Sequence, residues 1–196
     1  RQQDIYSQHL KRIGDFLIAS ALLIILSPIL MLTAILVRIT SPGPIIFKQE
    51  RLGKKQKIFA AYKFRTMTDV SRITTQQVHL DNPCITKVGY YLRRFKLDEL
   101  PQLFNIVRGE MSIIGPRPCL PETFETFNDD AFDRLLVRPG LTGLAQINGN
   151  TNLTWPERWS WDAFYVHNIS LKLDAQILWR TVGIVLFGES QTIRKC

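Results

Sequence analysis

Two adjacent carboxylates, Asp98 and Glu99, are the clearest candidates for chemistry in this sequence. They stand where a helical pattern begins and are followed by Pro101. Aspartate often caps a helix N-terminus, and the helix dipole favours a carboxylate there, so a structural cap is one interpretation. The same dipole binds phosphate, and an aspartate can attack phosphorus or hold Mg²⁺ together with substrate phosphates. The pair therefore indicates either a helix cap or a site for phosphoryl chemistry.

Three cationic segments complement this pair. On a strand, Lys63 and Arg65 of the run 63–67 would point to the same side. Two rigid turns, Gly115-Pro116-Arg117-Pro118 and the glycine-rich run from Arg138 to Gly143, each present one arginine. Guanidinium groups pair with phosphate in a bidentate way. Each segment alone is typical of a surface turn, and together they predict a polyphosphate site.

The elements expected to position these groups are mostly helical, so we predict an α-dominated fold, α+β with a little strand. A hairpin is expected from 45–49 and 58–64 around a basic turn at 53–57. Apolar spacing, a Thr154–Glu157 capping box and glycine stops predict helices over 87–95, 98–109, 121–136, from 154 onward, and 171–187 up to Gly188. Residues 68–85 are polar and predict a loop.

The N-terminal segment has the composition of a membrane helix. From Phe16 to Val37 there are 22 uncharged residues, about 33 Å of helix at the usual rise. Ser27-Pro28 in its middle predicts a break, and positive charge flanks both ends. Both features favour a re-entrant helix over a span, although proline is tolerated in spans as well. We expect a membrane segment over 1–40 and, over 41–196, a compact cytosolic domain on the membrane surface with amphipathic interfacial helices.

The charge of the chain is concentrated behind this segment. The formal charge is +8, and residues 38–72 alone carry nine cations and two acids, a sum of +7. A basic block beside a membrane segment favours anionic headgroups over nucleic acid as its partner. Three scattered cysteines and three lone histidines argue against a disulfide framework or a zinc site. The aromatic run that contains Trp155, Trp159 and Trp161 fits a membrane interface and a domain core about equally.

These motifs together resemble the bacterial sugar transferase family, the monotopic phosphoglycosyl transferases of the PglC type. The resemblance extends in order over nearly the whole chain. The matching segments are Lys11-Arg12-x-x-Asp15, Ser27-Pro28, Ser41-Pro42-Gly43-Pro44, Lys63-Phe64-Arg65-Thr66-Met67, Leu97-Asp98-Glu99-Leu100-Pro101-Gln102-Leu103, Met111-Ser112-Ile113-Ile114-Gly115-Pro116-Arg117-Pro118 and Arg138-Pro139-Gly140-Leu141-Thr142-Gly143-Leu144-Ala145-Gln146. One departure is Asn150, where the family often has arginine.

The resemblance implies transfer of a sugar 1-phosphate from a UDP-sugar to undecaprenyl phosphate, with release of UMP. It makes Asp98 the nucleophile of a covalent phosphosugar intermediate, with Glu99 in support and Mg²⁺ as cofactor on Asp98. The residues expected to bind substrate phosphates are Lys63, Arg65, Thr66, Pro116, Arg117, Arg138 and Gln146. It also implies a re-entrant helix broken at Ser27 and Pro28, and a location on the cytoplasmic face of the bacterial inner membrane.

The alternative is a non-catalytic, polybasic module that binds the membrane surface or serves there as a scaffold. It explains the basic block and the membrane segment, but not the paired carboxylates beside rigid arginine turns. Other glycan-assembly enzymes are conceivable partners of either kind of protein, whereas nucleic acid is not expected. The sequence does not specify the sugar, the glycan pathway or the oligomeric state.

Overall fold

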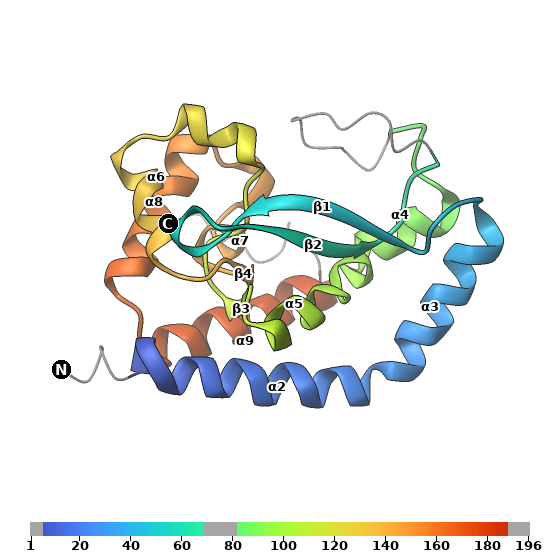
Figure 1. The fold of residues 1–196 in the computed structure, drawn as a ribbon, viewed down its shortest axis with the longest axis horizontal. Helices are drawn as coiled ribbons and strands as arrows, with labels where there is room; N and C mark the ends of the chain where they lie inside the picture. Colours follow the sequence, from blue (N-terminus) through green and yellow to red (C-terminus); the bar gives the residue numbers. More distant parts are fainter. Residues whose placement is uncertain (1–5, 69–81, 188–196) are drawn as a thin grey trace.

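The structure is a computed structural model of the 196-residue chain, and it describes residues 6–68 and 82–187 (Figure 1). Its helices are α2 (Lys11–Ile25), α3 (Ser27–Thr40), α4 (Lys87–Arg94), α5 (Gln102–Arg108), α6 (Asp129–Asp133), α7 (Leu144–Ile147), α8 (Trp155–His167) and α9 (Leu171–Phe187). Its strands are β1 (Ile46–Leu52), β2 (Ile58–Phe64), β3 (Ser112–Ile114) and β4 (Gly140–Thr142). The predicted α-dominated fold with a little strand is confirmed.

The helix pair α2 and α3 bends where the sequence predicts a break. The two axes differ by 63°, and Pro28 is the second residue of α3. Proline has no N–H for the carbonyl four residues earlier, which is that of Ile24. The Ser27 hydroxyl donates to this carbonyl instead, over 2.8 Å. Within the described residues no single helix is long and apolar enough to cross a membrane, whereas this bent pair taken together meets both requirements.

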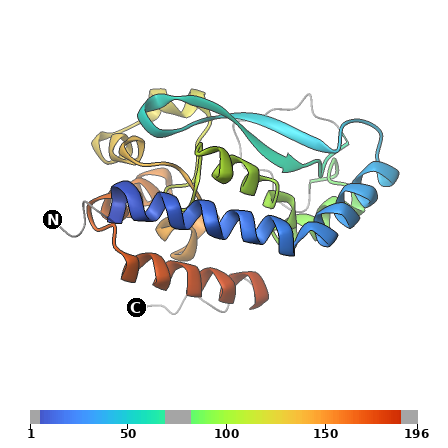
Figure 2. The same cartoon turned by 60° about the horizontal axis from the view of Figure 1, so that its bottom comes forward.

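Charged residues at the start of α2 attach it to the rest of the fold. Lys11 Nζ lies 2.7 Å from a carboxylate oxygen of Asp174 in α9. The Arg12 guanidinium donates to the carbonyls of Ile106 and Val107, over 2.6 and 2.9 Å. These carbonyls belong to the last turn of α5, which lacks a following turn to supply the usual N–H donors, although the Gly109 N–H also reaches the Ile106 carbonyl. In Figures 1 and 2, α2 accordingly runs beside α5 and α9.

Asp15 adds a buried contact between α2 and β3. Its carboxylate accepts from the Ser112 hydroxyl, over 2.7 Å, and from the Ile113 backbone N–H, over 3.1 Å. With Lys11 and Arg12, Asp15 gives the N-terminal charged motif a structural explanation: each of its three charged residues bonds a different element.

Two small sheets complete the framework. Strands β1 and β2 form the predicted antiparallel hairpin, although β1 extends three residues beyond the expected end at Gln49, so that Leu52 pairs with Ile58. Strands β3 and β4 are parallel, with Ser112 opposite Gly140. The main core lies between these sheets and the helices and includes Phe59, Ala61, Leu103, Ile106, Met111, Tyr165 and Ile177.

Two helix predictions are wrong in detail. The segment 121–136 is not one amphipathic helix: a 3-10 stretch ends at Thr126, α6 begins at Asp129, and another 3-10 turn follows. The interruption has a local cause, because Asn128 adopts an extended conformation and its side chain accepts from the Ala131 N–H as an N-cap. Likewise α5 begins at Gln102 rather than at Asp98, which lies in a separate 3-10 turn over Leu97–Glu99.

The C-terminal helices agree with the sequence. Helix α8 carries the predicted capping box between Thr154 and Glu157. Its tryptophans divide between core and surface: Trp159 is buried, whereas Trp155 and Trp161 are exposed. Helix α9 ends its described part at Phe187, and the predicted stop at Gly188 lies outside the described residues, as does most of the predicted loop over 68–85.

Candidate active site

Asp98 and Glu99 lie together in the turn between α4 and α5, and both are buried. The chain enters this turn through Lys96, whose φ of 57° is left-handed, and leaves it at Pro101, directly before α5. The carboxylates therefore lie in a tight turn that precedes the helix, which replaces the predicted position at the helix N-terminus itself.

Glu99 is held by two cations from other parts of the chain. Lys63 of β2 donates to Oε1 over 2.8 Å. Arg117 makes a two-pronged contact, with Nη2 to Oε1 at 2.6 Å and Nη1 to Oε2 at 3.2 Å. Burial alone would raise the pKa of Glu99, but the charges and hydrogen bonds of Arg117 and Lys63 hold it well below its usual range. Glu99 is thus a permanent anion at the centre of this cluster.

The pKa of Asp98 shifts in the opposite direction from that of Glu99. Burial, reinforced by the neighbouring charge of Glu99, raises the pKa of Asp98 to about 6. The positive charges of Lys63, Arg93 and Arg117 oppose this rise. Two adjacent carboxylates thus have pKa values displaced in opposite directions, an arrangement that is common where neighbouring carboxyl groups serve different functions.

Further arginines lie near the carboxylate pair or near Arg117, and they come from separate elements. Arg93 of α4 donates from Nε to the Thr66 hydroxyl over 2.8 Å, which places the predicted Thr66 beside the cluster. Arg51 of β1 donates to the Pro118 carbonyl over 3.1 Å, and its charge interacts with those of Arg117 and Glu99. Arg158 of α8 interacts electrostatically with Arg117. Together with Lys63, these arginines give the site an excess of positive charge suited to a diphosphate.

Comparison with known proteins identifies the family of the chain. The family model described as bacterial sugar transferase matches residues 6–188. The uncharacterized sugar transferase EpsL of Bacillus subtilis is 41% identical over 180 residues, covering 92% of this chain and 89% of EpsL. The exopolysaccharide production protein ExoY of Sinorhizobium fredii is 39% identical over 195 residues, covering 91% of this chain and 86% of ExoY. The chain belongs to the bacterial sugar transferase family.

Relatives with more specific names are longer proteins. The UDP-glucose:undecaprenyl-phosphate glucose-1-phosphate transferase of Klebsiella pneumoniae is 40% identical over 181 residues, which cover 88% of this chain but 39% of that protein. The undecaprenyl-phosphate galactose phosphotransferase of Salmonella typhimurium is 35% identical over 197 residues, covering 92% of this chain and 41% of that protein. The chain therefore spans about two fifths of the length of each of these two relatives.

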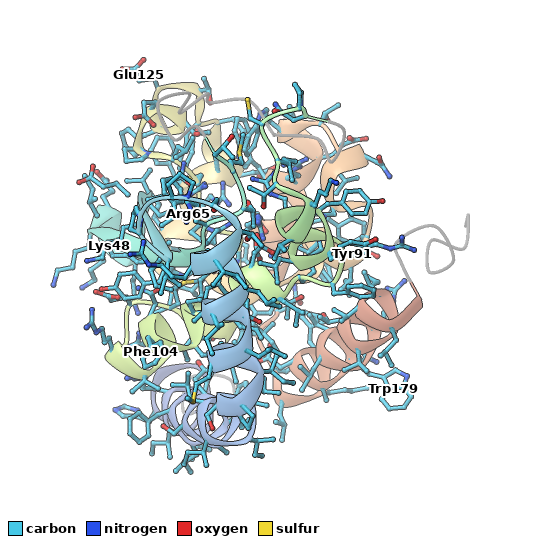
Figure 3. All side chains as sticks on the ribbon, turned by 90° about the vertical axis from the view of Figure 1, so that its right-hand side faces the viewer. Lys48, Arg65, Tyr91, Phe104, Glu125 and Trp179 are labelled. Carbon is cyan, nitrogen blue, oxygen red and sulfur yellow. The ribbon has the colours of Figure 1, made fainter. Side chains whose placement is uncertain are left out.

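Not every residue predicted for this transferase's site lies there. Arg65 follows the last residue of β2, and its buried guanidinium donates to Val37, Ser41 and Pro44 at the C-terminal end of α3. Figure 3 shows it beside that helix. Its donors are thus directed at carbonyls at and just after the helix end and away from Glu99, and a contact of Arg65 with phosphate stays a prediction.

Arg138 lies at the other end of α5 from the carboxylates. Its Nε donates to the Gly109 carbonyl over 2.9 Å, and it does not take part in the contacts to Glu99. Pro116 helps to fix the turn before Arg117, since its carbonyl accepts from the Gly140 N–H over 2.8 Å. Gln146 lies in α7 with both amide atoms buried and, among the described residues, without a hydrogen-bond partner.

The arginines that the sequence did not indicate, Arg51, Arg93 and Arg158, come from three elements far apart in the chain. Of the three, only Arg158 lies next to a motif that the sequence indicated, because it directly follows the capping-box residue Glu157. Within residues 6–68 and 82–187, no group of three His, Cys, Asp or Glu side chains could hold a metal without help. Mg²⁺ commonly needs one or two carboxylates together with substrate phosphates, and the Asp98 carboxylate fits that partial role.

Proposed function

We propose that this chain transfers a sugar 1-phosphate from a UDP-sugar to undecaprenyl phosphate and releases UMP, as the first membrane step in assembling a glycoconjugate. The observation that carries the proposal is the Asp98–Glu99 pair, in which Glu99 is fixed by Lys63 and Arg117 while the pKa of Asp98 is raised to about 6. The name of the Klebsiella relative supports the donor and acceptor classes.

In the proposed reaction, Asp98 attacks the phosphorus that carries the sugar. A new bond forms between a carboxylate oxygen and phosphorus, and the bond from phosphorus to the bridging oxygen breaks, so that UMP leaves with the electron pair. A phosphate oxygen of the lipid acceptor then attacks the same phosphorus and releases Asp98. The carboxylate returns unchanged, and the sugar phosphate has moved to the lipid.

The surrounding cations give this attack its electrostatic support. A buried carboxylate and a diphosphate repel each other, and positive charge placed beforehand offsets this repulsion. Arg117 bonds Glu99 with two nitrogens, which keeps its guanidinium in one orientation beside Asp98. We also propose Mg²⁺ as the cofactor, held by Asp98 with the donor's phosphates, where it would neutralise phosphate charge.

We further propose that the bent pair α2–α3 enters the cytoplasmic leaflet of the inner membrane and returns to the same face. Large apolar side chains near the bend face outward: Ile24 and Ile25 are 75% and 69% exposed. Such exposure is unfavourable in water and favourable in hydrocarbon. The basic residues that follow α3 would then contact anionic headgroups. This position brings Asp98 within reach of an acceptor whose phosphate lies at the lipid surface.

The test is the mass of the protein with donor alone. Wild type incubated with a panel of UDP-sugars should gain the mass of one phosphosugar and release UMP, and Asp98→Asn should do neither. Asp133→Asn, which also removes one carboxylate but from α6, is the matched control and should react as wild type does. Normal turnover by Asp98→Asn without an adduct would refute the covalent mechanism. Absence of turnover by wild type with every donor would favour the membrane scaffold instead.

A further inference from the structure

A second buried ion pair lies behind the candidate site. Asp162 of α8 and Arg134, at the start of the turn after α6, approach to 3.2 Å between Oδ2 and Nη2. Their side chains are only 3% and 5% exposed. Burial raises the pKa of Asp162 to about 6, against the opposing charges of Arg134 and Arg158. Neither residue contacts Asp98 or Glu99 in the bonds described above, so the proposed reaction leaves the pair without a role.

The pair is connected to the site through Arg117. The same nitrogen of Arg134 that faces Asp162 also donates to the backbone carbonyl of Arg117. The Arg134 guanidinium lies 5.8 Å from the centre of the Phe127 ring, which limits its freedom on another side. The backbone of Arg117 is thus held by Arg134 from the turn after α6, and Arg134 is in turn paired with Asp162 of α8, while the Arg117 side chain extends to Glu99.

Energetics argue that such a pair does more than hold the fold together. Removing two charges from water costs several kcal/mol per ion, and apolar side chains of similar volume often stabilise a protein as well or better. A buried ion pair is therefore weak evidence for stability. This pair has a specific consequence. It orients Arg134, which donates to the backbone carbonyl of Arg117, and the side chain of Arg117 binds Glu99.

We propose that Asp162 and Arg134 are positioning residues that fix Arg117 on Glu99, and thereby set the orientation of the Asp98–Glu99 turn toward the donor phosphates. The order of contacts is Asp162 to Arg134, Arg134 to the Arg117 carbonyl, and the Arg117 guanidinium to Glu99. The kinetic part of this inference rests on the proposed function, and its structural part does not.

The double variant Arg134→Met/Asp162→Leu tests positioning apart from stability. It removes both charges of the pair together, so neither Arg134 nor Asp162 is left buried without its partner, and the unfolding midpoint should stay close to that of wild type. Without the contact to its carbonyl, Arg117 should shift, and kcat/KM for the UDP-sugar should fall about 10- to 100-fold. The control is Asp133→Asn/His167→Asn, which removes the exposed pair at 2.7 Å that also joins α6 to α8. Its kcat/KM should stay within about twofold of wild type.

A double-mutant cycle identifies the route. If the pair acts through Arg117, then Arg134→Met/Asp162→Leu should cost less than about twofold in an Arg117→Lys background. A full loss in that background would overturn the inference, since the effect would then pass through another neighbour such as Arg158. Wild-type kcat/KM in a stable Arg134→Met/Asp162→Leu protein would overturn it as well.

An NMR measurement on the Arg117 guanidinium tests the positioning without relying on transferase activity. The Arg117 guanidinium, labelled with ¹⁵N, should show slowly exchanging Nη protons in wild type because it forms two bonds to Glu99. These signals should broaden or vanish in Arg134→Met/Asp162→Leu and in the single variant Asp162→Asn, and persist in the control. If wild type transfers no sugar phosphate, the proposed function fails, while this signature still decides the inference. Unchanged Arg117 signals in a folded variant would refute it.

Discussion

The Ser27 hydroxyl donates a hydrogen bond to the Ile24 carbonyl, the acceptor that Pro28 cannot reach with an N–H of its own. Pro28 thus removes one helical hydrogen bond, and the hydroxyl of the preceding residue, Ser27, replaces the missing donor in the same turn. This local exchange lets the backbone bend by 63° while the acceptor at Ile24 stays satisfied. It explains why the pair of residues occurs together in the middle of an apolar segment.

Restoring the missing donor should straighten this segment. Pro28→Ala supplies an N–H to Ile24 and removes the ring clash, so α2 and α3 should join into one helix. From the 63° bend and about 1.5 Å per residue, the distance between the ends of the pair should grow by about 6 Å. Spin labels at positions 14 and 39 would measure it, and Ser20→Ala, a change within α2, should leave the distance as in wild type. An unchanged distance in Pro28→Ala would show that packing, and not proline, sets the bend.

The raised pKa of Asp98 predicts how transfer depends on pH. The attacking form is the carboxylate, so kcat/KM should be half-maximal near pH 6, approach its full value about one unit higher, and fall about tenfold per unit well below pH 6, as Asp98 takes up a proton near its pKa of about 6. Initial rates of UMP release between pH 5 and 8 would measure this acid limb.

Glu99→Gln should move that limb to lower pH. The substitution removes a negative neighbour that raises the pKa of Asp98, and it leaves Lys63 and Arg117 to stabilise the Asp98 carboxylate. The maximal rate should nevertheless drop, since Arg117 loses the partner that orients it. Asp133→Asn should keep the wild-type limb, and a limb that stays at the same pH in Glu99→Gln would mean that a different group titrates.

Arg65→Ala should impair the fold and spare the donor site. The substitution leaves carbonyls of Val37, Ser41 and Pro44 without their donor, which should lower the free energy of unfolding by about 3 kcal/mol. The KM for the UDP-sugar should stay within about twofold of wild type for protein that remains folded. Arg94→Ala, at an exposed arginine of α4, is the control and should change neither quantity. A large rise in KM would instead place Arg65 at the phosphate site.

Trp179→Gln should weaken attachment to membranes without affecting the fold. Trp179 is 80% exposed on α9, and Figure 3 shows it projecting from the outer face of that helix. Sedimentation with vesicles that contain anionic lipid should show a several-fold lower bound fraction for Trp179→Gln, with an unchanged melting temperature. Trp159→Gln should instead lower the melting temperature, because Trp159 is buried and supports the domain, and the folded fraction should bind vesicles as wild type does. Equal binding by Trp179→Gln and wild type would place α9 away from the lipid.

Local chemistry determined which features could be predicted. The bend at Ser27-Pro28 and the capping box at Thr154 depend on residues within one turn, and both occur where the sequence places them. The interruption at Asn128 also has a local cause, but the apolar spacing of Phe124 and Phe127 suggested a continuous helix. In the structure those rings instead pack on one another, with centroids 5.4 Å apart.

The composition of the cationic cluster depended on tertiary structure. Alternation along a strand places Lys63 and Arg65 on one side only while the strand continues, and β2 ends at Phe64 between them. Lys63 therefore reaches Glu99, whereas Arg65 turns to α3. Arg51 and Arg93 come near Glu99, and Arg158 near Arg117, only when the hairpin, α4 and α8 are packed, and no spacing in the sequence records that approach.

The contacts of Arg12 fix the separation between the start of α2 and the turn that holds Asp98. Arg12 bonds two carbonyls in the last turn of α5, and the carboxylates lie in the turn before α5, separated from it by Leu100 and Pro101. The seven residues of α5, about 10 Å long, therefore form a rigid spacer between the base of the lipid-seeking segment and the reactive pair. For a chain seated in a bilayer as proposed, this spacer fixes the height of Asp98 above the hydrocarbon. Acceptors would then be selected by how far their phosphate stands from the lipid tails, before any contact with their chemistry.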